Sequence, residues 1–143
     1  MDTSNNATNL LSEEEILQAP ESEYMSDEQL AFFRQKLIDL YESTCVSIKE
    51  AKDKILTPID LSDANDRASS EEQSNIALRI VDREQKLLPK IQQSLKQIQD
   101  GSYGYCLESG EPIGIPRLLA RPTAEYSADV KSLKEMKELR FKD

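Results

Sequence analysis

The chain has 143 residues, of which 38% are hydrophobic and 31% charged, and this composition is typical of long solvated helices rather than of a large globular core. Its net charge of −9 argues against a free-standing nucleic-acid binder, because such a protein needs a basic face to displace counterions from phosphates. The acidic balance favours a partner with basic groups, or a bound metal ion.

Two cysteines, Cys45 and Cys106, lie far apart in the sequence, and there is no histidine. We therefore expect no structural disulfide, and a reducing cytoplasm as the compartment. No apolar run approaches the roughly 18 residues of a membrane helix, and residues 1–9 lack the basic segment of a secretory signal. The sequence also lacks a nucleophile paired with a base and a glycine-rich phosphate loop, so we do not expect an enzyme.

Residues 1–23 are expected to form a flexible or partly helical arm. Residues 1–11 are small and polar, whereas Ser12 and Glu15 have the spacing of a capping box. This box predicts a short helix that runs to Gln18 and ends before Pro20. A loose acidic arm is the alternative.

A first long helix is predicted from about Ser26 to Thr57. Ser26 and Gln29 form a second capping-box pattern, and no glycine or proline follows before Pro58. A helix of about 30 residues is ~45 Å long at ~1.5 Å per residue, which favours a coiled-coil arm. The apolar or small residues recur in steps of three and four: Leu30, Phe33, Leu37, Leu40, Thr44, Ile48, Ala51 and Ile55. Polar residues interrupt the far end, at Ser47, Lys52 and Lys54, so we expect looser packing there.

A second long helix is predicted from about Ser69, or from as early as Asp63, to Asp100. Gly101 follows as the stop signal. Its stripe is Ala77, Ile80, Leu87, Ile91, Leu95 and Ile98, which predicts antiparallel pairing with the first helix. Pro89 interrupts this pattern, and we expect either a kink near residues 85–89 or two shorter helices joined there.

The turn between the two helices carries Asp63 and Asp66. Carboxylates at the far end of a helical hairpin do not contribute to a core. They either cap the second helix or meet something outside the protein.

Residues 102–126 are rich in glycine, proline and aromatic residues and predict a small knuckle with a short hairpin. A locally basic segment, residues 117–122, follows. Ser127 begins a last helix with Val130, Leu133 and Met136 on one face.

The knuckle resembles the DksA/TraR zinc-finger family. The matching motifs are Gly104-Tyr105-Cys106, Glu111-Pro112-Ile113-Gly114-Ile115, Arg117-Leu118 and Ala120-Arg121-Pro122-Thr123-Ala124. Further matches are Tyr24-Met25, Glu28-Gln29-Leu30, Asp82-Arg83-Glu84, Lys86-Leu87 and the Asp-x-x-Asp-x-Ala pattern at Asp63, Asp66 and Ala68. The resemblance covers roughly residues 24 to 135, with the motifs in order and at matching spacing.

The resemblance implies a mainly α fold. A long antiparallel coiled-coil hairpin (24–101, with its tip near 58–68) stands on a small base that contains a degenerate zinc-finger-like knuckle and a C-terminal helix (102–143). The family binds zinc through four cysteines, and only Cys106 remains, because the other positions hold Ser109, Ser127 and Val130. We therefore expect no zinc. Val130 is expected to fill the metal's place and Cys106 to be a small buried hydrophobe, with a redox-reactive thiol as the alternative.

The resemblance further implies a cytoplasmic, monomeric transcription regulator that does not contact DNA. Family members insert the hairpin into the secondary channel of bacterial RNA polymerase and act with ppGpp in the stringent response, at ribosomal RNA and biosynthetic promoters. By motif position, the tip residues that act near the polymerase active site are Asp63, Asp66 and Ala68. The ppGpp-binding positions are Leu87, Lys90, Arg121 and Lys131, with Arg83 and Arg117 as supporting polymerase-facing cations.

Two other interpretations remain open. A Gre-like transcript-cleavage factor also sends an acidic hairpin tip into this channel, although such factors carry a different, larger C-terminal domain. A coiled-coil assembly or chaperone subunit would use the hairpin as a passive arm, and its tip carboxylates would be dispensable.

Overall fold

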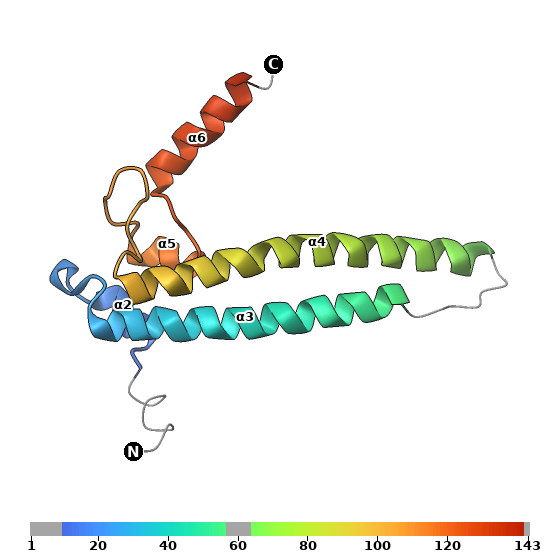
Figure 1. The fold of residues 1–143 in the computed structure, drawn as a ribbon, viewed down its shortest axis with the longest axis horizontal. Helices are drawn as coiled ribbons and strands as arrows, with labels where there is room; N and C mark the ends of the chain where they lie inside the picture. The colour runs from blue at the N-terminus through green and yellow to red at the C-terminus, as the bar shows by residue number, and fades with distance from the viewer. Residues whose placement is uncertain (1–9, 57–63, 142–143) are drawn as a thin grey trace. The chain divides into compact units, whose positions relative to one another are not determined.

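The computed structural model describes residues 10–56 and 64–141. The side chains of residues 56, 64–66 and 138–141 lie outside this description. The elements, in chain order, are α2 (Glu13–Gln18), the 3₁₀ helix η1 (Glu21–Glu23), α3 (Asp27–Leu56), α4 (Ala64–Asp100), α5 (Ile115–Ala120) and α6 (Ala128–Phe141) (Figure 1).

The mainly α fold with a long helical hairpin is confirmed. The hairpin predicted in the knuckle is reduced to one isolated antiparallel bridge between Tyr105 and Pro112, and no strand occurs in the described ranges. No helix within the same ranges combines the length and the apolar character needed to cross a membrane.

The chain divides into two compact units. One, the arm unit, is Ile38–Gln93, and the other, the base unit, combines Met1–Leu37 with Ser94–Asp143. The helices α3 and α4 each contribute to both units.

The first predicted capping box forms completely, and the second forms in part. Ser12 Oγ accepts a hydrogen bond from the Glu15 amide at 3.1 Å, and Glu15 Oε1 accepts one from the Ser12 amide at 3.1 Å. Ser26 Oγ accepts from the Gln29 amide at 3.3 Å, but Gln29 Oε1 accepts from Met25, one residue earlier than predicted, at 2.9 Å. These bonds satisfy N–H groups that have no partner within the first turn of a helix.

The helix α4 is continuous for 37 residues and passes through Pro89. The alternative of two shorter helices is therefore wrong, while the kink near residues 85–89 stays a prediction. A proline costs about 3 kcal/mol in an isolated helix, and burial of the neighbouring Ile91, which is fully inaccessible, offsets part of this cost. The helix ends at Asp100, and Gly101 follows it with a left-handed φ of +84°. The amides of Ser102 and Tyr103 both donate to the Gln97 carbonyl.

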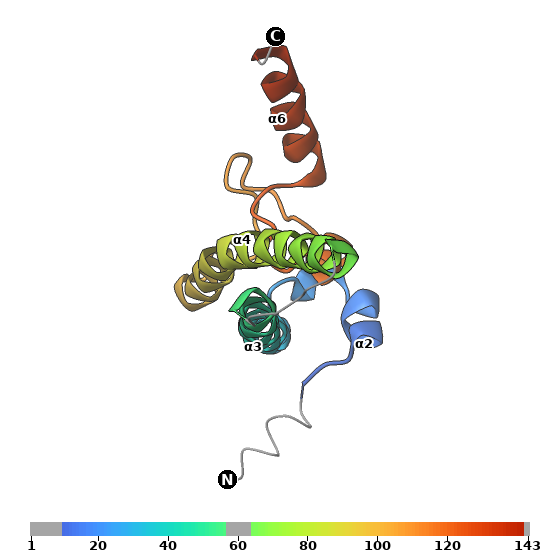
Figure 2. The same cartoon turned by 90° about the vertical axis from the view of Figure 1, so that its right-hand side faces the viewer.

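In the arm unit, α3 and α4 lie side by side and antiparallel (Figures 1 and 2). The buried residues of α3 here are Thr44, Ile48 and Ala51, and those of α4 are Ala77 and Ile91. All five belong to the predicted stripes. Thr44 satisfies its hydroxyl by donating to the Leu40 carbonyl at 2.6 Å. The seam of the arm unit is therefore built mainly from small and β-branched side chains.

The core of the base unit forms around Phe33 and Tyr103, whose ring centroids are 5.6 Å apart. Leu37, Ile16 and Leu118 are equally inaccessible to solvent. Leu118 belongs to α5, a helix that was not predicted and that packs against α2. The last helix, α6, begins as predicted, with Ser127 Oγ accepting from the Val130 amide at 3.3 Å. Its Leu133 and Met136 are exposed, so the predicted apolar face is not buried.

Candidate functional site

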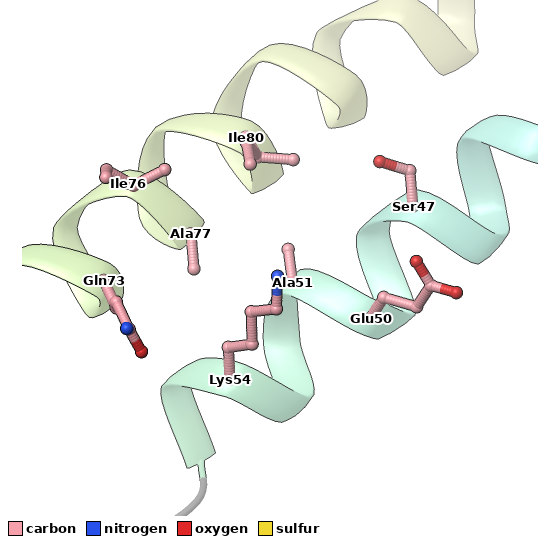
Figure 3. A pocket seen from close by; sticks show the side chains of 8 residues that line it. All are labelled: Ser47, Glu50, Ala51, Lys54, Gln73, Ile76, Ala77 and Ile80. Carbon is pink, nitrogen blue, oxygen red and sulfur yellow. The ribbon is translucent and has the colours of Figure 1, made fainter. Parts of the chain in front are cut away.

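The far part of the arm unit contains a half-open pocket of about 530 Å³ between α3 and α4 (Figure 3). Small side chains, Ala51 and Ala77, face each other across it, and Ser47 and Lys54 lie where a tight seam would carry aliphatic residues. A pocket at this place agrees with the expected looser packing toward the far end of the seam. Ile76, on the wall of the pocket, is 48% exposed, which leaves apolar surface on this part of the arm open to solvent.

The predicted tip residues lie at or just before the start of α4. Asp63 falls outside the described residues. Asp66 lies in the first turn of α4, although its side chain is not described, and Ala68 is exposed. A carboxylate in the first turn interacts favourably with the helix dipole. The location of Asp66 is therefore compatible with helix capping and with a contact to a partner.

Three of the predicted polymerase-facing or ppGpp-binding residues lie on α4 in the arm unit. Arg83, Leu87 and Lys90 follow one another at spacings of four and three, which places them on one face of the helix. Arg83 and Lys90 are exposed and Leu87 is half-buried. Arg83 forms an exposed ion pair of 3.4 Å with Glu84, which leaves much of its guanidinium available to a partner.

The other three lie in the base unit. Arg121 is exposed at the end of α5, and Lys131 is half-buried in the first turn of α6. Arg117 donates from Nε to the Tyr126 carbonyl at 3.0 Å, so it ties α5 to the segment that leads into α6. Arg121, Lys131 and Arg117 all belong to the base unit. Arg117 also has a hydrogen-bond partner within the protein, which the sequence did not predict.

The four positions of the degenerate zinc site do not fit zinc. Structural zinc sites use four sulfur or imidazole ligands in a tetrahedron, and this set offers one thiol, two hydroxyls and a valine. Both hydroxyl oxygens already accept hydrogen bonds, Ser109 from the Glu111 amide and Ser127 from the Val130 amide, each at 3.3 Å. Among the side chains that the structure describes, no group of three or more acidic, cysteine or histidine residues is placed to hold a metal ion.

The sulfur of Cys106 lies among polar donors. Cys106 is 3% exposed, so its predicted burial is confirmed. Burial alone raises the pKa of its thiol, but hydrogen bonds from the Ser109 hydroxyl and from the amides of Ser109, Ser127 and Glu108 outweigh burial and lower this pKa to about 6. The interpretation of Cys106 as a plain hydrophobe is therefore incomplete. The same donors bring three of the four former zinc positions together around one sulfur.

Two tyrosine hydroxyls, neither of them predicted as functional, connect distant parts of the base unit. Tyr24 Oη donates to the Gly104 carbonyl at 2.5 Å and accepts from the Gly114 amide at 3.0 Å. Tyr103 Oη donates to the Pro122 carbonyl at 2.7 Å. Burial raises the pKa of both phenols. These bonds hold the knuckle by side chains that do not depend on a metal.

Comparison with known proteins identifies two matching families. Residues 29–98 match the family described as "DnaK suppressor protein DksA, N-terminal domain". Residues 101–135 match the family described as "Prokaryotic dksA/traR C4-type zinc finger". The two matched segments follow each other along the chain and together cover α3, α4, α5 and part of α6.

Similar proteins and a solved structure cover nearly the whole chain. A protein of Caulobacter vibrioides named "RNA polymerase-binding transcription factor DksA" is 39% identical over 138 residues, which cover 96% of this chain and 97% of the relative. A protein of the same name from Escherichia coli K12 is 41% identical over 124 residues, covering 83% and 80%. The structure of transcription factor DksA2 from Pseudomonas aeruginosa matches with a TM-score of 0.74 and 40% identity, over 89% of this chain and 98% of that one.

Proposed function

The chain belongs to the DksA family, and we propose that it is a transcription regulator that binds bacterial RNA polymerase. One observation carries this proposal. The chain aligns over 96% of its length, arm and base included, with a relative named as an RNA polymerase-binding factor. An assembly or chaperone subunit that used only a helical hairpin would not need to match this family in the knuckle and in α6 as well.

The arm is proposed to enter the secondary channel of the polymerase, with Asp63, Asp66 and Ala68 near the active site. Two observations support this role: Ala68 is exposed, and Asp66 lies in the first turn of α4. Carboxylates on a stiff helical arm are suited to meet basic side chains or the shell of a catalytic Mg²⁺ ion. The Gre-like alternative is less well supported, because residues 101–135 match the dksA/traR C4-type zinc-finger family.

The response to ppGpp is proposed to depend on Leu87, Lys90, Arg121 and Lys131, with Arg83 and Arg117 in support. Exposed cations suit this ligand, because its phosphates need charge-assisted donors. The shared face of Arg83, Leu87 and Lys90 on α4 supports the arm half of the proposal. The exposure of Arg121 supports the base half.

We propose that the protein acts without zinc. The donor set at Cys106, Ser109, Ser127 and Val130 does not match a zinc site, and the tyrosine hydrogen bonds hold the knuckle independently. The regulator is further proposed to be a cytoplasmic monomer that contacts polymerase rather than DNA and has no catalytic activity of its own. The net charge of −9 supports the choice of a protein partner.

The testing experiment compares wild type with two groups of variants in polymerase binding and in transcription from a ribosomal RNA promoter. Asp66→Asn is expected to bind polymerase like wild type and to lose the promoter effect. Lys90→Ala and Lys131→Ala are expected to keep the basal effect and to weaken synergy with ppGpp. An unchanged promoter effect in Asp66→Asn would restore helix capping as the role of that carboxylate. Unchanged synergy in the lysine variants would remove them from the ppGpp site.

A further inference from the structure

An apolar groove of about 480 Å³ opens in the base unit, between α2 with the turn that follows it and the segment that leads into α5. Its walls include Leu17 and Pro20 on one side and Pro112, Ile115 and Pro116 on the other. Leu17 is 52% exposed even though the neighbouring Ile16 is completely buried. A concave, largely apolar surface with a few polar groups is the default hypothesis for a binding site, and Leu17 forms part of this one.

The groove is preformed. Its floor rests on buried Ile16, and its two walls are joined because Tyr24, which also lines it, bonds to Gly104 and Gly114. The three prolines restrict the backbone of both walls. A partner that enters such a groove does not need to order it first, and this lowers the entropic cost of association.

The charged residue among those that line the groove is acidic. Glu21 lines the groove and is exposed, whereas the other lining residues are apolar or uncharged. Glu14 and Glu15 are also exposed on α2, the helix that carries Leu17. Lys36 pairs with Glu13 of the same helix at 3.3 Å and offsets that carboxylate. The charge that the groove itself presents to a partner is therefore negative, and it favours a partner segment that carries lysine or arginine.

We propose that this groove docks a segment of bacterial RNA polymerase that places an apolar side chain against Leu17 and a lysine or arginine beside Glu21. This inference rests on the proposed function, because it names a contact surface for the same partner. It assigns polymerase affinity to the base unit, separately from the promoter effect assigned to Asp66.

The test measures the affinity of the full-length protein for purified core polymerase by fluorescence anisotropy, at two salt concentrations. Leu17→Glu removes the exposed apolar side chain from the wall of the groove and adds a negative charge where the partner's apolar side chain is proposed to lie. Leu107→Glu is the matched control, because Leu107 is 53% exposed in the same unit and does not line the groove. Circular dichroism verifies that both variants fold, which is expected because both positions face solvent.

We expect Leu17→Glu to raise the Kd about tenfold, as half-burial of a leucine side chain warrants, and Leu107→Glu to leave it unchanged. Glu21→Lys should weaken binding at low salt and lose most of its effect at high salt. Equal affinity of Leu17→Glu and wild type, or equal weakening by both leucine variants, would overturn the inference and leave the proposed function intact. Dimerisation of the free protein that Leu17→Glu abolishes would assign the groove to a second copy instead. If the wild-type protein does not bind polymerase, both this inference and the proposed function are wrong.

Discussion

Replacement of Tyr24 by phenylalanine tests how the knuckle is held without a metal. The change removes one hydroxyl that bonds at 2.5 Å to the Gly104 carbonyl and at 3.0 Å to the Gly114 amide. The ring remains, with its edge-on contact to Tyr105 at 5.6 Å. Each hydrogen bond contributes about 1 kcal/mol net, and the amide left without its partner is only half-buried, so we expect a cost of about 2 kcal/mol.

The assay is hydrogen exchange at the Gly114 amide, combined with urea denaturation. A cost of about 2 kcal/mol corresponds to roughly thirtyfold faster exchange where local opening controls the rate. Tyr105→Phe is the matched control, because Tyr105 lies in the same knuckle and is 37% exposed, and it should change stability by less than about 0.5 kcal/mol. If the two variants exchange alike, the Tyr24 hydroxyl does not hold the knuckle.

Three further predictions concern buried polar groups. Ser94 is fully buried and its hydroxyl has no hydrogen-bond partner, so Ser94→Ala should raise the free energy of unfolding by about 1 kcal/mol in urea; a loss of stability would show that the hydroxyl is satisfied. Burial raises the pKa of Tyr24 and Tyr103 above their ordinary value of 10, so deprotonation above pH 10 favours the unfolded chain. The melting temperature should therefore be retained below pH 10 and fall as pH rises above it. A melting temperature that does not change up to pH 11 would contradict this prediction. The pKa of Cys106 is lowered from 9 to about 6, so the stability contributed by its thiolate should be present above pH 9 and disappear as pH falls through 6. Cys106→Ala should therefore lower the free energy of unfolding more at pH 8.5 than at pH 5.5. An equal loss at both pH values would contradict this prediction.

The long helices were predictable because their signals are local. Ser26 with Gln29 marks a start, Gly101 marks an end, and apolar steps of three and four mark the buried face between them. Pro89 suggested two shorter helices, and this alternative was wrong. The rule that proline breaks a helix is local, and it does not include the packing of the residues around the proline. The short helix α5 was missed because six residues are too few for a periodicity, and it is held by burial of Leu118.

The candidate site was predictable only in part. The degenerate zinc positions follow from the resemblance to the family's four-cysteine pattern, in which Cys106 is the one cysteine kept, and the structure gathers Ser109 and Ser127 around that sulfur. The role of Tyr24 has no such signal, because its partners lie 80 and 90 residues further along the chain. The acidic groove at Leu17 likewise depends on the approach of two segments about 100 residues apart, which no local pattern encodes.

The most direct test of a zinc-independent polymerase regulator is transcription from a ribosomal RNA promoter by purified bacterial polymerase, with protein prepared in a chelator and ppGpp added in parallel. We predict that the protein contains negligible zinc, that it inhibits the promoter in the presence of the chelator, and that ppGpp deepens the inhibition. Stoichiometric zinc in the purified protein, or loss of inhibition on chelation, would contradict the account.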